Sequence, residues 1–265
     1  MLAGQMRTDS TGTGGAHVTT ARRREQPRSV KLTEAVARRI VDDIVARDLA
    51  AGAALATEAE MAVQYDVSRA TVREALRILE TNGLVTIKPG RYGGPQVGHA
   101  DPLAFARSLT WFLQMRRTHF WELLEARVIM EPLMAALAAR RRGEDAPLEL
   151  RTAVESHRDL DPADNVGYLA ATQDFHGLIA GISGNGVLDL FGRALKELYT
   201  SRAIIEERPA ARREEVLIEH ERVVDAILSG DPDRAEAEMR AHMVALAEGF
   251  DKQYAALRDE IVGWW

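Results

Sequence analysis

Residues 67–85, VSRATVREALRILETNGLV, restrict the fold more than any other stretch, because a polar, arginine-bearing start leads into a regular apolar stripe. Ser68 is a favourable N-cap, since its hydroxyl can accept a hydrogen bond from an amide that the first helical turn leaves free. Gly83 suits the left-handed residue that often closes a helix. The inward stripe of the predicted helix consists of Val72, Ala75, Leu76 and Leu79. The stretch therefore predicts a short helix that is buried along one face and presents charge at its N-terminal end.

Two further helices are predicted upstream of this one. Apolar residues recur at every fourth position over residues 31–50, with charged residues between them, which predicts an amphipathic helix. Thr57 and Glu60 have the spacing of a capping box, in which each side chain satisfies a free amide at the helix start. They open a short helix over residues 58–65, and a tight turn then leads to Ser68.

The segment after the third helix predicts a β-hairpin. LVTIK is a strand candidate, PGRYGGP is a glycine-rich tip, and QV belongs to the returning strand. Three helices followed by a hairpin is the order of a winged helix-turn-helix, whose recognition helix places its N-terminal side chains in the major groove of DNA. This order predicts a DNA-binding domain over residues 30–97.

The expected DNA contacts come from the start of the third helix and from the wing. Arginine pairs with guanine edges or with phosphates, while hydroxyls and free amides at a helix start suit phosphate oxygens. A lone exposed arginine is more often a solvated helix charge, but the capped helices and the wing in this order favour contact with duplex DNA. The predicted contact residues are Ser68, Arg69, Thr71, Arg73, Lys88, Arg91, Gly93 and Gly94.

The sequence VSRATVREALRILETNGLV closely resembles the signature of the GntR family of bacterial transcription regulators. The upstream helix and the wing fit the same family, so that the resemblance covers residues 30–97. It implies that the partner is a double-stranded DNA operator. Ala59 is a departure, because family members often carry an arginine there that contacts DNA. The resemblance therefore implies an operator that differs from common ones.

The charge of the chain is divided unevenly between its two ends. The 265 residues are enough for two domains or one large domain, the hydrophobic content of 46% supports a real core, and the net charge is −6. The balance is +3 over residues 1–97 and −9 beyond them. Much of the positive surplus lies in an arginine cluster within residues 1–29, which are predicted to be a disordered tail. A DNA contact and an ordinary solvated tail are both compatible with this cluster.

The sequence contains no apolar run of about 20 residues, so no membrane span is predicted. The N-terminal residues lack the apolar stretch of a secretory signal, and the chain contains no cysteine, so disulfides and thiolate metal ligands are excluded. A cytoplasmic location is the expectation.

The remainder of the chain is predicted to be an all-α antiparallel bundle over residues 103–258, reached through a linker at 98–102. Its pattern is helical throughout, and glycine and proline residues mark the helix ends. The predicted helices cover residues 103–115, 119–142, 147–158, 164–182, 187–207, 211–229 and 232–256. The expected fold class is thus mainly α, with an N-terminal winged helix-turn-helix followed by a helical bundle.

Segments of this region resemble the FCD ligand-binding domain that accompanies the FadR branch of GntR regulators. They are LLEARVIMEPLMAALAA, DFHGLIAGISGN and EHERVVDAILSGDPDRAEAEMRAHM. The resemblance implies a homodimer that responds to a small organic acid, an acyl compound or a metal held in the bundle.

Three of the seven histidines, His176, His220 and His242, lie in separate predicted helices. His220 and His242 are joined by a helical hairpin with the turn SGDP, so the chain returns to nearly the same height. Imidazoles from different helices can converge on a divalent metal such as zinc or nickel. The pocket can equally be free of metal, with the three histidines donating hydrogen bonds to the effector. Both interpretations remain open from the sequence.

Two more residues bear on this site. Metal-binding members of the family have a carboxylate four residues before the first histidine, and Thr172 occupies that position here. A hydroxyl is a poor substitute, and Asp174 points about 160° away on a helix, so weaker metal binding is expected unless an acidic effector supplies an oxygen. Arg127 matches a ligand-contacting segment of the family. It is expected either to pair with a carboxylate effector or to form a structural ion pair.

Parts of the sequence are also compatible with two other classes of function. Three imidazoles can hold the zinc of a metal-dependent hydrolase, but the chain contains no HExxH, nucleophile elbow, phosphate-binding loop or dinucleotide fingerprint. A DNA-architectural protein, whose bundle only dimerises, would have a filled core without a ligand site. The sequence favours a dimeric regulator that is not an enzyme, and a repressor over an activator.

Overall fold

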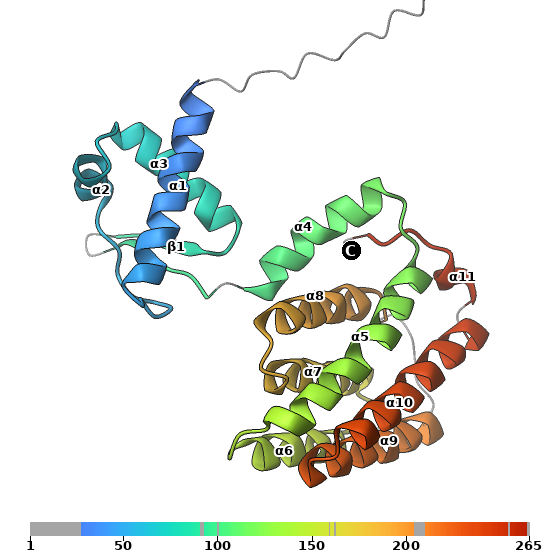
Figure 1. The fold of residues 1–265 in the computed structure, drawn as a ribbon. Helices are drawn as coiled ribbons and strands as arrows, with labels where there is room; N and C mark the ends of the chain where they lie inside the picture. The colour runs from blue at the N-terminus through green and yellow to red at the C-terminus, as the bar shows by residue number, and fades with distance from the viewer. Residues whose placement is uncertain are drawn as a thin grey trace, which may run out of the picture.

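The structure, a computed structural model, describes residues 28–90, 93–99, 101–158, 160–161, 163–203, 210–253 and 255–263. The predicted tail lies outside these ranges except for its last two residues. The described residues form two units with separate hydrophobic cores, which are joined through the chain that leads into α4 (Figure 1). Within these ranges every helix is too short or too polar to cross a lipid bilayer.

The N-terminal unit has the predicted order of three helices and a hairpin (Figure 1). Its helices are α1 (Arg28–Ala46), α2 (Glu58–Gln64) and α3 (Arg69–Thr81), and its strands are β1 (Val85–Lys88) and β2 (Gly94–Val97). The winged helix-turn-helix expected from the sequence is therefore confirmed.

Two local caps fix where α2 and α3 begin. Thr57 Oγ1 accepts a hydrogen bond from the Glu60 amide at 3.3 Å, and the Glu60 carboxylate accepts one from the Thr57 amide at 2.8 Å. Ser68 Oγ accepts a hydrogen bond from the Thr71 amide at 3.1 Å. The stripe of α3 packs on α1 in a shared core, where burying an apolar side chain contributes about 1.5–3 kcal/mol. The buried residues of α3 are Val72, Ala75, Leu76 and Leu79.

The wing is an antiparallel pair in which Val85 lies opposite Val97 and Lys88 lies opposite Gly94. A third segment extends this sheet, since the Val97 amide donates to the Ala53 carbonyl at 2.9 Å. Ala54 also forms an isolated bridge with Gln96. The sequence pattern did not predict this third segment, which ties the α1–α2 connection to the wing.

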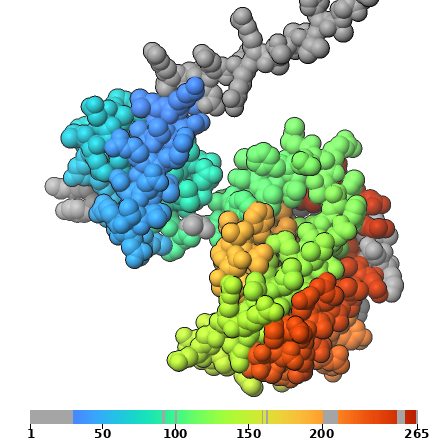
Figure 2. Space-filling view, in the orientation of Figure 1, coloured from blue at the N-terminus to red at the C-terminus, as the bar shows by residue number. Residues whose placement is uncertain are grey.

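The C-terminal unit is helical throughout the part of the chain that the structure describes. Its helices are α4 (Pro102–Met115), α5 (Phe120–Arg141), α6 (Ala146–Arg158), α7 (Asn165–Ile182), α8 (Gly186–Ala203), α9 (Ala210–Ser229), α10 (Pro232–Gln253) and α11 (Ala255–Arg258). Helix α5 packs against α7, α8, α9 and α10, and in Figure 2 α5 and α10 lie side by side across one face. The predicted all-α bundle is confirmed, and α8 is described as far as Ala203.

Side-chain caps set several of the helix ends. Asp101 Oδ1 accepts from the Leu103 amide at 2.9 Å, so α4 already begins at Pro102, inside the segment predicted to be a linker. Asn185 Oδ1 accepts from the Val187 amide at 3.1 Å, and Asp231 Oδ1 accepts from the Arg234 amide at 3.0 Å. Asn185 and Asp231 thus cap the first turns of α8 and α10.

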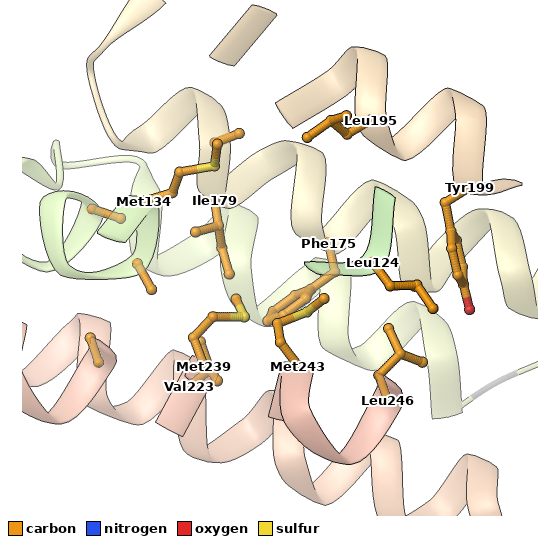
Figure 3. Close-up of a cluster of buried hydrophobic side chains, with 14 of the residues drawn as sticks. Leu124, Met134, Phe175, Ile179, Leu195, Tyr199, Val223, Met239, Met243 and Leu246 are labelled. Carbon is orange, nitrogen blue, oxygen red and sulfur yellow. The ribbon is translucent and has the colours of Figure 1, made fainter. Parts of the chain in front are cut away.

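The bundle core lies between α5, α7, α8, α9 and α10. Figure 3 shows part of it, in which α7 contributes Phe175 and Ile179, and α10 contributes Met239 and Met243. This apolar packing surrounds the few polar side chains buried in the same helices, and it fixes their positions relative to one another.

Candidate nucleic-acid interface and histidine cluster

The start of α3 exposes the residues that were predicted to contact DNA. Ser68, Arg69 and Arg73 are exposed, and Thr71 is half-buried. The Ser68 and Thr71 hydroxyls lie 2.9 Å apart, so the cap also holds the Thr71 side chain at the helix start. The apolar stripe of α3 faces the core, and these polar side chains therefore point outward, as a recognition helix requires.

Arg73 does not extend freely into solvent. Its Nε donates to Glu58 Oε1 at 3.0 Å and its Nη2 donates to Glu58 Oε2 at 2.6 Å. The hydrogen bond from Arg73 is the largest cause that lowers the pKa of Glu58 below its ordinary value, and burial opposes it. This two-pronged pair joins the start of α2 to the second turn of α3, and the sequence pattern did not indicate it.

The wing places Lys88, Gly93 and Gly94 close together, while Arg91 lies outside the described residues. Lys88 is exposed and pairs with Gly94 across the hairpin. A Cβ at Gly93 would lie 2.2 Å from the Lys88 carbonyl oxygen, so only glycine fits there. The tight tip keeps the backbone of the wing accessible beside the exposed Lys88 side chain.

The three predicted histidines converge inside the bundle. His176 comes from α7, His220 from α9 and His242 from α10, and all three are buried. His220 Nε2 and His242 Nε2 lie 3.3 Å apart, and His242 Nε2 and His176 Nε2 lie 3.4 Å apart. Phe175 stacks on the His220 ring with centroids 3.9 Å apart. Packing thus holds the rings with their Nε2 atoms turned toward one point.

The other ring nitrogen of each histidine faces a specific partner. His176 Nδ1 lies 2.5 Å from Glu131 Oε2, and His242 Nδ1 lies 2.7 Å from Glu219 Oε2. His220 Nδ1 lies 3.4 Å from the Nδ1 atom of His157 on α6. Such outer contacts fix the ring orientation and the tautomer of metal-binding histidines.

These partners determine where the protons lie. A carboxylate only accepts, so the hydrogen bond to Glu219 places the proton of His242 on Nδ1, and the approach of Glu131 Oε2 to His176 Nδ1 favours the same tautomer there. In their neutral forms both rings then turn unprotonated Nε2 atoms toward each other across 3.4 Å. Two facing lone pairs repel, and either an added proton or a cation between them would remove the repulsion.

Burial makes an added proton unfavourable at two of the three rings. It lowers the pKa of His176 to about 4, although Glu131 opposes the shift. It also lowers the pKa of His220 well below its ordinary value, and the charge of a protonated His242 would act in the same direction. Burial therefore favours the neutral form of the His176 and His220 rings.

Arg127 lies beside this cluster. Its side chain is 1% exposed, and its Nε donates to Glu131 Oε1 at 2.5 Å. Burial raises the pKa of Glu131, but the charges of Arg127 and His176 outweigh it, so the pKa lies far below its ordinary range. The guanidinium also lies over the Tyr199 ring, 4.6 Å from its centroid. Arg127 Nη1 and Nη2 are buried and form no hydrogen bond with any described residue.

Thr172 is buried, and its hydroxyl donates to the Tyr168 carbonyl at 2.7 Å. Asp174 is exposed and pairs with Lys196 at 2.8 Å, which agrees with the expectation that it points away from the histidines. The aspartate expected from the family resemblance thus has no carboxylate substitute on α7. The carboxylates of the cluster, Glu131 and Glu219, instead contact the outer nitrogens of the rings.

The sequence did not predict that Glu131, His157 and Glu219 contact the outer nitrogens of the three rings. One signal existed for Glu131, because it follows Arg127 by four residues and such residues meet on one helix face. Glu219 and His157 depend on how α9 packs on α10 and α6, which no local pattern gives.

A winged helix that exposes arginines at the start of its third helix is the architecture of a sequence-reading DNA-binding protein. The family model described as "Bacterial regulatory proteins, gntR family" matches residues 32–92, and the model of the FCD domain matches residues 122–245. The chain belongs to the GntR family of bacterial transcription regulators. It is a DNA-binding regulator and not an enzyme.

Individual proteins agree with this assignment. The HTH-type transcriptional repressor NanR of Cronobacter sakazakii is 30% identical over 225 residues, which are 80% of this chain and 83% of that protein. The HTH-type transcriptional regulator LutR of Bacillus subtilis is 29% identical over 69% of this chain and 84% of its own length. A solved Streptococcus agalactiae GntR structure has a TM-score of 0.65 and 27% identity, and the match covers 82% of this chain and 99% of that one.

Proposed function

We propose that the chain is a homodimeric repressor whose hold on a palindromic operator is set by a small organic acid and a divalent cation in the bundle. The observation that carries this proposal is the convergence of three buried Nε2 atoms beside a buried arginine. The repressor assignment is supported by the NanR relatives, which are named repressors. Its proposed location is the cytoplasm, where bacterial DNA lies.

The distances in the histidine cluster support a cation. Two nitrogens bound to one tetrahedral zinc at about 2.0–2.1 Å lie about 3.3–3.4 Å apart. The two Nε2 separations of 3.3 Å and 3.4 Å have this value. His176, His220 and His242 would supply three ligands, and their outer nitrogens are already held by Glu131, His157 and Glu219. When bound, the cation would act as a Lewis acid that holds an anionic oxygen.

Two features support a carboxylate as the effector. Arg127 Nη1 and Nη2 are buried without a hydrogen-bond partner among the described residues, and a guanidinium fork fits a carboxylate. Thr172 stands where family members have a carboxylate ligand, so a ligand position is left for an oxygen from the effector. An organic acid between the cation and Arg127 would satisfy both.

The dimer is supported by apolar side chains that α4 leaves exposed. Trp111, Phe112 and Met115 are 64%, 71% and 86% exposed on this helix. Large exposed apolar groups of this kind mark protein interfaces. A second copy against α4 would lie next to the connection to the winged unit. An effector that favours one arrangement of the dimer would change the spacing of the two recognition helices and therefore operator affinity.

Native mass spectrometry with elemental analysis of the purified protein tests this proposal. The expected result is a dimer that carries one Zn²⁺ or Ni²⁺ per chain, lost on dialysis against a chelator and regained when the metal is returned. A dimer that takes up no divalent metal but retains an organic acid would favour the metal-free pocket. A monomer without metal or ligand would contradict the proposal.

Operator binding should weaken steeply with salt. Arg69, Arg73 and Lys88 are exposed on the DNA-facing side, and a dimer that contacts about six to eight phosphates would give a slope of about −5 to −7 in log K against log salt. Fluorescence anisotropy at several potassium glutamate concentrations measures this slope. A flat response would contradict phosphate contacts by the wing and α3.

A further inference from the structure

The pair between Glu58 and Arg73 has a defined geometry. Glu58 is the first residue of α2, and Arg73 lies in the second turn of α3. The carboxylate binds the Nε and Nη2 side of the guanidinium at 3.0 Å and 2.6 Å. This leaves both N–H groups of Nη1 and one N–H of Nη2 available on the outer end of the same planar group.

The environment of the pair indicates that its contribution to fold stability is small and does not by itself explain why the pair is present. The two side chains are 56% and 31% exposed, and ion pairs at such exposure stabilise a fold only slightly. Packing between α2 and α3 is already supplied by buried residues such as Met61 and Val72. The charges of Arg69 and Arg77 also lower the pKa of Glu58, so this carboxylate stays ionised among three arginines.

The Glu58 carboxylate lies on the side of the winged unit that must approach DNA phosphates, and it repels them. It therefore lowers the affinity for DNA of any sequence. A compensating gain arises if the carboxylate limits the rotation of the arginine, since less side-chain entropy is then lost when the guanidinium binds. The outer edge of a fixed guanidinium can donate two parallel hydrogen bonds to O6 and N7 of guanine.

We propose that Glu58 is a specificity-determining positioning residue: it holds the Arg73 guanidinium in the orientation that reads one guanine in each operator half-site. Glu58 acts through Arg73 and does not itself contact the base. This inference builds on the DNA-binding role of the family and assigns to Glu58 the discrimination of a base, in addition to any effect on affinity.

The experiment compares the full-length parent with Glu58→Gln, which keeps the size of the side chain and removes its charge. A pool of duplexes of about 30 base pairs with random centres is selected on the parent. Anisotropy then measures affinity for the selected palindrome, for versions with one base pair changed, and for a mixed-sequence duplex of the same length. Arg73→Ala identifies the base pair that Arg73 reads, because preference at that position is lost.

The matched control is Glu74→Gln. Glu74 lies on α3 and pairs with Arg77 at a single contact of 3.5 Å, so the variant removes the same charge from the same surface without touching Arg73. We expect the parent to prefer guanine at the position read by Arg73 by about tenfold or more, as a bidentate contact allows. Glu58→Gln should reduce this preference several-fold and leave binding to the mixed duplex equal or stronger. Glu74→Gln should keep the preference.

Three results would overturn the proposal. In the first, Glu58→Gln keeps the full guanine preference while Arg73→Ala loses it, which would show that Glu58 does not position Arg73. In the second, Glu58→Gln and Glu74→Gln raise the affinity for all duplexes by the same factor and leave the base preferences unchanged. Glu58 would then affect DNA binding only through its negative charge. In the third, Arg73→Ala binds every duplex as the parent does. This would show that the Glu58–Arg73 pair does not contact DNA, while the assignment of the chain as a regulator would stand.

Discussion

His242→Ala should lower the affinity of the chain for Zn²⁺ by about a hundredfold or more. His242 Nε2 lies 3.3 Å from His220 Nε2 and 3.4 Å from His176 Nε2, so it is the ring that faces both of the others. Structural zinc sites with four ligands bind with about 10–16 kcal/mol, so that one ligand corresponds to roughly 3 kcal/mol, or about two decades in affinity. Competition with a chromogenic chelator measures the change at constant pH.

Two variants give this measurement its controls. His157→Gln should weaken Zn²⁺ by about 10–100-fold, because His157 contacts the outer nitrogen of His220 and not the proposed cation. His99→Ala should have no effect, since His99 is exposed ahead of α4. Urea unfolding of each metal-free variant separates loss of folding from loss of a ligand. If a folded His242→Ala protein binds Zn²⁺ as tightly as the parent, the three-histidine site is wrong.

The helices were predictable because each has local signals at its ends. Ser68 caps α3, Asp231 caps α10 and Asn185 caps α8, and each cap uses a side chain and an amide two or three residues away. Such contacts are encoded within one turn and need no knowledge of the rest of the fold. The bounds of the observed helices therefore lie close to those read from the sequence.

Non-local pairings were not predictable in the same way. Ala53 joins the wing by accepting from the Val97 amide, and the Phe120 amide donates to Glu260 near the end of the described chain. Residues 52–55 form three backbone hydrogen bonds with β2, and residues 260–262 form two with residues 118–120, so both segments are too short to show the alternation of a strand. The partner of such a segment is set by how distant elements pack, and periodicity carries no information on it.

In the candidate site, too, some residues were predictable from the sequence and others depend on tertiary packing. His176, His220 and His242 were identified because helical hairpins return the chain to a similar height and because a family resemblance supplied their spacing. Glu219 precedes His220 by one residue and therefore points about 100° away from it on α9. Its carboxylate reaches His242 on α10 at 2.7 Å only because of the way the two helices cross. The outer partners of the cluster thus follow from tertiary packing.

Arg127→Met is expected to destabilise the metal-free chain by about 3–5 kcal/mol, because it leaves the Glu131 carboxylate buried without its cationic partner. Urea unfolding followed by circular dichroism measures this. Arg127→Met combined with Glu131→Gln should recover most of the loss, since a neutral amide oxygen can still accept from His176 Nδ1. If the double variant is as unstable as the single one, the loss comes from packing around Tyr199 and not from an unpaired charge.

The stability loss caused by Arg127→Met should also depend on pH. Arg127 holds the pKa of Glu131 below the ordinary value of 4.5, so the pair stabilises the fold fully above that pH. The stability difference between the parent and Arg127→Met should be largest near neutral pH. It should shrink as the pH falls, because burial without Arg127 raises the pKa of Glu131 in the variant, which therefore protonates this carboxylate before the parent does. A difference that stays constant from pH 7 to pH 4 would show that the Glu131 charge contributes nothing to it. The buried arginine would then stabilise the fold through its packing, which includes the Tyr199 ring, and not through its pairing with Glu131.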